Sequence, residues 1–203
     1  MGKGDISLSM YKKQSNLNNK SLDSILQSVK AEQTSQKKQI PPLDQWNPQS
    51  CGKMDLCIRA NGTWWHEGVP IQRASMIQLF SHILCKEENK YYLKTPAEKV
   101  EIQVEDAPLF VNRIEQVIEN DSVWIYAYTT DDDIVVLNEK NSIVMKDFEG
   151  EVRPYIYIRY GLYALIQRSA FFHLIDAGDL VENEQGQTEL ILQSGDFRLH
   201  LMA

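Results

Sequence analysis

Three arginines could bind an anion, because each is expected in or next to a helix in an otherwise acidic chain. Arg73 should begin one helix, Arg159 should precede a second helix, and Arg168 should lie on the flank of that second helix. A buried guanidinium without an anion is costly, so each arginine needs a negative partner. Four carboxylates are candidates for a partner within the protein: Glu98, Glu101, Glu105 and Asp106. The alternative partner is a ligand phosphate or carboxylate, bound through two hydrogen bonds near a helix N-terminus.

Three further residues could complete such a site. Lys99, in the segment Thr95–Lys99 between two expected strands, could contact a phosphate; equally, Thr95 could cap a turn and Glu98 could bridge the two halves. Trp64 and Tyr155 could stack on a planar base, or they could pack in the core. The predicted ligand contacts are therefore these six residues: Arg73, Lys99, Arg159, Arg168, Trp64 and Tyr155.

Common catalytic motifs are missing from the sequence. It contains no phosphate-binding loop, no dinucleotide-binding glycine pattern, no nucleophile elbow and no zinc-protease motif. His66 and Glu67, with Glu98, could act as acid and base only if they converged in one pocket. The segment Asp131–Asp133 lacks the alternate ligands and glycine of a calcium loop, so we expect the solvated tip of a hairpin. We expect a protein that is not an enzyme, and the sequence identifies no cofactor.

Charge and hydrophobicity exclude several classes of protein. The net charge is −7; residues 1–40 carry seven lysines and three acidic residues, so the remaining chain is strongly acidic. A nucleic-acid polymer is an unsuitable partner because phosphate attraction needs a basic face. No apolar run is long enough to span a membrane, and the N-terminus lacks the apolar stretch of a signal peptide. We therefore expect a cytoplasmic protein with three reduced cysteines.

Composition divides the chain into a tail and two folded parts. Residues 1–40 are rich in Ser, Asn, Gln and Lys, which predicts a disordered basic tail, with one loosely helical segment at Ser21–Lys30. Residues 41–96 should form an N-terminal α+β repeat and residues 97–203 a C-terminal one. The sequence does not predict an oligomeric state.

Apolar spacing predicts two helices. The first, Arg73–Leu84, has one apolar face; the second, Leu162–Asp176, is apolar all round, so we expect it to be buried at the centre of the molecule. The intervening short runs of β-branched and aromatic residues, separated by turn formers, predict an antiparallel sheet curled into a sandwich or partial barrel. The expected strands are 55–59, 63–66, 91–94, 100–104, 107–114, 123–129, 134–137, 143–145, 152–160, 190–193 and 197–201.

Two hexapeptides about ninety residues apart read alike: Leu79–Leu84 and Ala170–Ile175. Each ends a helix-like segment and is followed by a pair of expected strands. This similarity predicts a duplicated strand-helix-hairpin unit and an α+β fold.

Several motifs occur together in the order found in one bacterial family. They are Trp46–Pro48, Gly62–Trp64, Gly68–Arg73, Tyr92–Lys99, Glu105–Pro108, Pro154–Tyr155, Arg159 and Leu165–Arg168. With them the chain resembles the family catalogued as domain of unknown function 1285, over about residues 41–203. The resemblance implies a duplicated α+β unit whose C-terminal part is superficially similar to pleckstrin-homology folds. It also implies a nucleotide-like ligand at the junction of the two halves and a role in signalling.

The leading hypothesis is a non-catalytic regulatory protein that binds a small anionic ligand between its halves; the resemblance implies that this ligand is nucleotide-like. A second hypothesis is a protein-interaction module that uses its surface and basic tail to bind an acidic partner. A third is an unrecognised hydrolase built on His66, Glu67 and Glu98.

Overall fold

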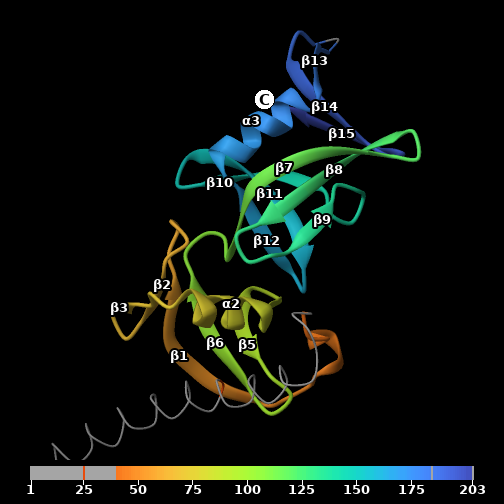
Figure 1. Cartoon of the computed structure of the whole chain (residues 1–203). Helices are drawn as coiled ribbons and strands as arrows, with labels where there is room; N and C mark the ends of the chain where they lie inside the picture. Colours follow the sequence, from red (N-terminus) through yellow and green to blue (C-terminus); the bar gives the residue numbers. More distant parts are fainter. Residues whose placement is uncertain (1–24, 26–39, 184, 203) are drawn as a thin grey trace, which may run out of the picture. The chain divides into compact units, whose positions relative to one another are not determined.

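The structure is a computed structural model and describes residues 25, 40–183 and 185–202. These residues contain fifteen strands and two α-helices in curled, mixed sheets, so the fold is mostly β (Figure 1). Within them no helix has the length and apolar character needed to cross a membrane. The predicted tail and the helix at Ser21–Lys30 lie outside the described residues, except that Ile25 is helical and its side chain is fully buried.

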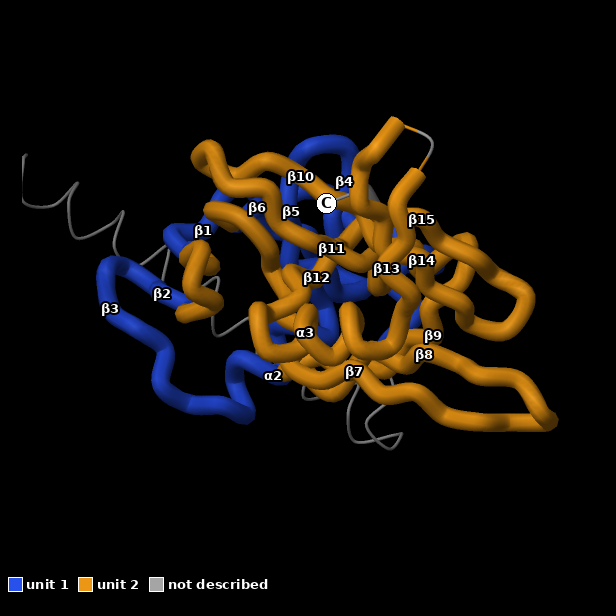
Figure 2. Tube along the Cα trace, turned by 90° about the horizontal axis from the view of Figure 1, so that it is seen from above, with its two compact units in different colours: residues 1–57, 64–103 blue, residues 58–63, 104–203 orange. Residues whose placement is uncertain are grey.

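The chain divides into two compact units (Figure 2). Unit 1 comprises residues 1–57 and 64–103, and unit 2 comprises residues 58–63 and 104–203. Unit 1 ends at Gln103, whereas the sequence analysis placed the boundary after Pro96. The reason is that β6 (Lys99–Val104) pairs antiparallel with β5 (Lys90–Lys94), which keeps this hairpin in one sheet.

Unit 1 is built on a six-stranded sheet, sheet A, in the order β3-β2-β1-β6-β5-β4. Its other elements are η1 (Leu43–Gln45), β1 (Ser50–Ile58), β2 (Trp64–His66), β3 (Val69–Pro70), α2 (Ala74–His82) and β4 (Leu84–Glu87). Helix α2 buries Leu79 and Phe80, and the Phe80 ring lies 6.1 Å from that of Trp64. The predicted first helix is confirmed but is shorter, because Ile83 caps it and Leu84 begins β4.

Unit 2 contains a six-stranded sheet, sheet B, in the order β10-β11-β12-β7-β8-β9, and a three-stranded sheet, sheet C, in the order β13-β14-β15. The strands of sheet B are β7 (Leu109–Glu119), β8 (Ser122–Thr129), β9 (Ile134–Val136), β10 (Ile143–Phe148), β11 (Glu151–Arg159) and β12 (Leu162–Ile166). The remaining elements are α3 (Arg168–Asp176), β13 (Asp179–Glu182), β14 (Thr188–Ser194) and β15 (Phe197–Met202). Because β12 runs parallel to β7, sheet B is mixed rather than purely antiparallel as expected.

The predicted second helix is wrong over its first half. Residues Leu162–Ile166 form β12, in which Leu162, Ala164 and Ile166 are buried and the two residues between them are half-buried. Such alternation is the period of a strand. The left-handed residues Tyr160 and Gly161 form the two-residue turn that enters it.

The remaining helix is also not apolar all round. Only Ala170 and Leu174 of α3 are buried, while Phe172 is 54% exposed. Helix α3 therefore covers sheet B with one face, principally against β7.

Sheets B and C join through the turn between β14 and β15. The buried hydroxyl of Ser194 accepts the N–H of Ile125 at 3.1 Å, and the N–H of Gly195 donates to the carbonyl of Val123 at 2.7 Å. Gly195 has a φ of +55°, and a Cβ built there would lie 2.6 and 2.9 Å from Cζ3 and Cζ2 of Trp124. Only a residue without a Cβ fits this contact.

We predict that Gly195→Ala destabilises the protein by about 1–3 kcal/mol more than Gly150→Ala, because a Cβ at Gly195 meets the rigid ring of Trp124 whereas a Cβ at Gly150 meets no atom. Gly150 is the matched control: its φ is +85° and no atom lies within 4 Å of a built Cβ. Urea unfolding of both variants measures the difference. Equal losses would show that backbone strain, and not the Trp124 contact, limits substitution at Gly195.

Candidate functional site

A hollow of about 320 Å³ lies in unit 2 where β10, β11, β12 and α3 come together. Its lining consists of Met145 from β10, the residues 151–154 at the start of β11, the residues 165–168 from the end of β12 to the start of α3, and Phe171 of α3. Two guanidinium groups, those of Arg153 and Arg168, therefore lie at one hollow. Only Arg168 of this pair was predicted from the sequence.

The wall formed by β10 and β11 depends on a tight hairpin. Glu149 and Gly150 both have positive φ angles, 53° and 85°, and form its two-residue loop. The carboxylate of Asp147 accepts the N–H of Gly150 at 3.3 Å. The resulting register places Phe148 opposite Glu151, two residues before Arg153.

The guanidinium of Arg153 is held on two edges by two different carboxylates. Its Nη1 donates to Asp106 at 3.1 Å, whereas its Nε and Nη2 donate to Glu151 at 2.8 and 2.5 Å. The planar group also lies over the Phe148 ring, 4.7 Å from the centroid. The hydrogen bond that Arg153 donates to Glu151, and to a smaller extent the one that it donates to Asp106, raises the pKa of Arg153 above its ordinary value.

Asp106 is the buried member of this arrangement. Its side chain is 5% exposed, and its carboxylate accepts hydrogen bonds from Arg153 and from the hydroxyl of Tyr155, the latter at 2.6 Å. Burial, followed by the hydrogen bond to the negative Asp106, raises the pKa of Tyr155 well above its usual range. Tyr155 therefore donates to Asp106 as a neutral phenol.

Arg168 is the first residue of α3 and is exposed. Within the part of the chain that the structure describes, no carboxylate pairs with its guanidinium, which lies 5.7 Å from the ring centroid of Phe172. The N-cap residue, Gln167, makes no side-chain capping bond, although its own carbonyl accepts the N–H of Phe171. The partial positive charge at the N-terminus of this helix thus adds to the positive charge of Arg168, and both favour an anion.

The rest of the lining is largely apolar, with Met145, Val152, Pro154 and Phe171 contributing hydrocarbon or aromatic surface. The hollow therefore offers cationic hydrogen-bond donors beside an apolar surface. This combination can bind an anion that carries an uncharged body.

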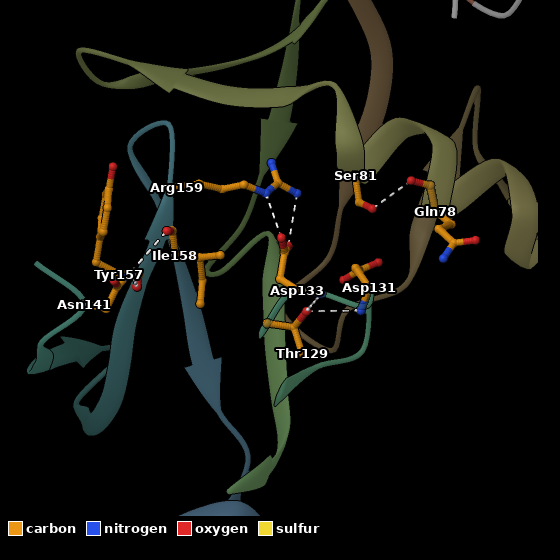
Figure 3. Close-up of polar contacts among 9 residues, drawn as sticks. All are labelled: Gln78, Ser81, Thr129, Asp131, Asp133, Asn141, Tyr157, Ile158 and Arg159. Atoms are coloured by element: carbon orange, nitrogen blue, oxygen red, sulfur yellow. Dashed lines mark hydrogen bonds and ion pairs between the residues drawn. The ribbon is translucent and has the colours of Figure 1, made fainter. Parts of the chain in front are cut away.

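Arg159 lies elsewhere in unit 2 and is paired within the protein. It ends β11 and leads into β12, not into a helix as predicted. Its Nε and Nη2 donate to the two oxygens of Asp133 at 3.0 and 3.1 Å (Figure 3). The side chains are 11% and 5% exposed, so this ion pair is buried.

The loop 130–133 does connect β8 to β9, as predicted for a hairpin, but its last aspartate is not solvated. The hydroxyl of Thr129 accepts the N–H groups of Asp131 and Asp133, which directs Asp133 inward toward Arg159. Among the residues of the described chain, no group of three or more His, Cys, Asp or Glu side chains could hold a metal ion.

Lys99 lies in unit 1, where it shares one carboxylate with a second lysine. Glu87 accepts a hydrogen bond from Lys94 at 2.9 Å and one from Lys99 at 2.5 Å. The side chains of these lysines are 10% and 19% exposed, respectively. The pKa of Glu87 is lowered, first by the hydrogen bond from Lys99 and then by that from Lys94. The expected turn is present beside this pair, since the Thr95 hydroxyl accepts the N–H of Glu98.

The other predicted residues of unit 1 have different surroundings. Trp64 is 3% exposed and packs against Phe80 in the core. Arg73 is the exposed N-cap residue of α2, and no carboxylate pairs with it among the described side chains. Nδ1 of His66 is hydrogen-bonded to the carbonyl of Asp55 at 2.8 Å.

Within unit 2, the structure thus links Arg168 and Tyr155 to the same region, because Tyr155 and Arg153 share Asp106. It places Arg159 in a separate buried ion pair. Arg153 and Glu151 were not among the residues predicted from the sequence, although the turn formers Glu149 and Gly150 directly before them indicate a hairpin there.

Comparisons with known proteins agree on one family. The model of the N-terminal domain of DUF1285, a domain of unknown function, matches residues 41–107, and the model of its C-terminal domain matches residues 108–201. A crystal structure of a DUF1285 family protein from Silicibacter pomeroyi DSS-3 is 36% identical with a TM-score of 0.74, covering 88% of this chain and 94% of that one. A DUF1285 family protein from Shewanella baltica OS155 is 26% identical with a TM-score of 0.48, covering 61% of this chain and 91% of that one. No curated protein matches the chain.

We predict that Asp133→Asn or Arg159→Met alone lowers the free energy of unfolding by about 3–5 kcal/mol, because each removes one charge of a buried ion pair and leaves the other charge in place. The double variant should lose less than the sum of the two. Urea unfolding of all four proteins measures the coupling, with Lys53→Met as a control, because the side chain of Lys53 is 73% exposed in its ion pair with Glu101. Additive losses would contradict a direct interaction.

We predict that Glu87 stabilises unit 1 only above acidic pH. Its pKa in the folded protein is below the ordinary value of 4.5, so its stabilisation is present above that value and is lost as the pH falls through the lowered pKa. The difference in unfolding free energy between the wild type and Glu87→Gln should therefore shrink between about pH 7 and about pH 3. A difference that stays constant with pH would rule out a contribution from the charged carboxylate.

Proposed function

This chain belongs to the DUF1285 family, and we propose that it binds a small anionic molecule in unit 2 and acts in regulation rather than catalysis. The observation that carries this proposal is that Arg153 and Arg168 line one hollow, although the chain has a net charge of −7. Two cationic groups that gather at one concave site favour an anion there.

The surroundings of Arg168 support binding. Its guanidinium is exposed, lines the hollow and, among the described residues, has no carboxylate bonded to it. An anion bound there gains charge-assisted hydrogen bonds without first displacing a protein group. The first turn of α3 also favours negative charge at this position.

The chemistry of the lining supports binding rather than reaction. The residues that line the hollow include one carboxylate, that of Glu151, and no histidine, cysteine, serine or lysine. A nucleotide-like ligand remains part of the proposal, since its phosphate would suit the two arginines. The site proposed here lies wholly within unit 2, so its ligand contacts are Arg153 and Arg168, with Tyr155 acting through Asp106.

We also propose that the chain arose from a duplicated unit, as the similar hexapeptides suggest. The order of elements supports this idea: α2 follows β1 to β3 and precedes β4 to β6, and α3 follows β10 to β12 and precedes β13 to β15. Strands β7 to β9 would then be an insertion. The similarity of the C-terminal part to pleckstrin-homology folds, and with it a role in signalling, belongs to the same proposal.

We predict that the full chain binds one or more compounds from a panel of organic carboxylates, phosphate esters and nucleotides. Arg168→Ala should weaken that binding about 10- to 100-fold, because the loss of a hydrogen bond to a charged group typically lowers affinity by such a factor. Isothermal titration calorimetry measures the affinities.

Arg198→Ala is the matched control, because Arg198 is exposed on β15 and does not line the hollow. It removes the same charge and should leave the affinity nearly unchanged. The absence of any binding at millimolar concentrations, or an equal effect of the two substitutions, would contradict the proposal.

A further inference from the structure

The two carboxylates bound to Arg153 differ in how firmly they are placed. Asp106 is 5% exposed and is fixed by a second hydrogen bond from Tyr155. Glu151 is 67% exposed, and among the described residues its carboxylate accepts hydrogen bonds from Arg153 alone. Exposed ion pairs contribute little to stability, whereas a buried carboxylate cannot be left unpaired. Asp106 is therefore a fixed support of Arg153, and Glu151 is an exchangeable partner.

The exchangeable edge of Arg153 has the geometry that recognises a carboxylate. Nε and Nη2 are adjacent donors on one side of the guanidinium, and both currently donate to Glu151. Asp106 and the Phe148 ring fix the opposite edge and one face of the group. A carboxylate that replaced Glu151 would find both donors already oriented, so little conformational entropy would be lost on binding.

Apolar side chains beside these donors indicate what the carboxylate is attached to. Pro154, Met145 and Phe171 line the hollow, and Val152 is 63% exposed at its edge. Burying such surface favours an aliphatic or aromatic body over a highly charged one. A polyphosphate would place several negative charges against only two guanidinium groups and near Glu151.

We infer that the ligand is an amphipathic monocarboxylate, with an aliphatic or aromatic body, whose carboxylate displaces Glu151 from Arg153 while Arg168 contributes a second positive charge. This inference rests on the proposed function and names its ligand class. Glu151 then acts as an internal competitor, occupying the donors of Arg153 until the ligand arrives.

The test uses the full chain and measures binding of 4-phenylbutyrate by calorimetry at low ionic strength. Three comparison probes separate the contributions: acetate lacks the apolar body, 4-phenylbutyramide lacks the charge, and inorganic phosphate represents an anion of another class. We expect 4-phenylbutyrate to bind at least about tenfold more tightly than each of them, because it alone has both features.

Glu151→Gln should strengthen the binding of 4-phenylbutyrate by about three- to tenfold, since it removes the competing charge from an exposed position. Glu139→Gln is the control, an exposed glutamate of unit 2 that does not line the hollow. It removes the same charge, and its effect should be less than twofold. Thermal unfolding of both variants checks that they are folded.

The outcomes separate this inference from the proposed function. If phosphate or a nucleotide binds in an Arg168-dependent way but 4-phenylbutyrate binds no better than acetate, the ligand class is wrong and the anion site stands. If Glu151→Gln has no larger effect than Glu139→Gln, Glu151 is not the competitor. If no anion binds in an Arg168-dependent way, both the inference and the proposed function are wrong.

Discussion

The buried carboxylate of Asp106 is the constraint on which the proposed site depends. A carboxylate that is 5% exposed needs a positive or hydrogen-bonding partner, and Asp106 has both, in Arg153 and Tyr155. These two side chains come from β11, whereas Asp106 precedes β7, so the contacts tie a connecting segment of unit 2 to its sheet. The position of the guanidinium at the hollow thus follows from a structural requirement.

The same physical rule separates the arginines of unit 2 into different roles. Arg159 is fully committed to structure, because it donates two hydrogen bonds to the buried Asp133. Arg153 satisfies a buried carboxylate with one edge and presents the other to an exposed glutamate. Arg168 lies at the exposed start of α3 and lines the hollow. Arg159 is bound to a buried carboxylate, Arg153 to one buried and one exposed carboxylate, and no carboxylate pairs with Arg168 among the described residues. Availability for a ligand therefore increases from Arg159 to Arg153 to Arg168.

Local sequence patterns predicted much of the fold. They failed where the spacing of apolar residues fits a helix as well as a strand. The first helix and most strands were found, since turn formers separate them. Leu162, Leu165 and Ile166 fit a helical spacing as well as part of an alternating strand, and the turn at Tyr160 and Gly161 was overlooked. The apolar run was therefore assigned to a helix, which also misplaced Arg159 at a helix start.

The candidate site was less accessible from sequence because its defining contacts are long-range. Arg153 and Asp106 are 47 residues apart, and only the pairing of β11 in sheet B brings them together. Asp106 was a candidate partner for the three predicted arginines, but it pairs with Arg153, which no local pattern singled out. The most direct test is the ¹⁵N NMR order parameter of the Arg153 Nε–H group in the wild type, Asp106→Asn and Glu151→Gln. The side chain should become mobile in Asp106→Asn and stay ordered in Glu151→Gln; the reverse pattern would show that Asp106 does not hold Arg153 in place.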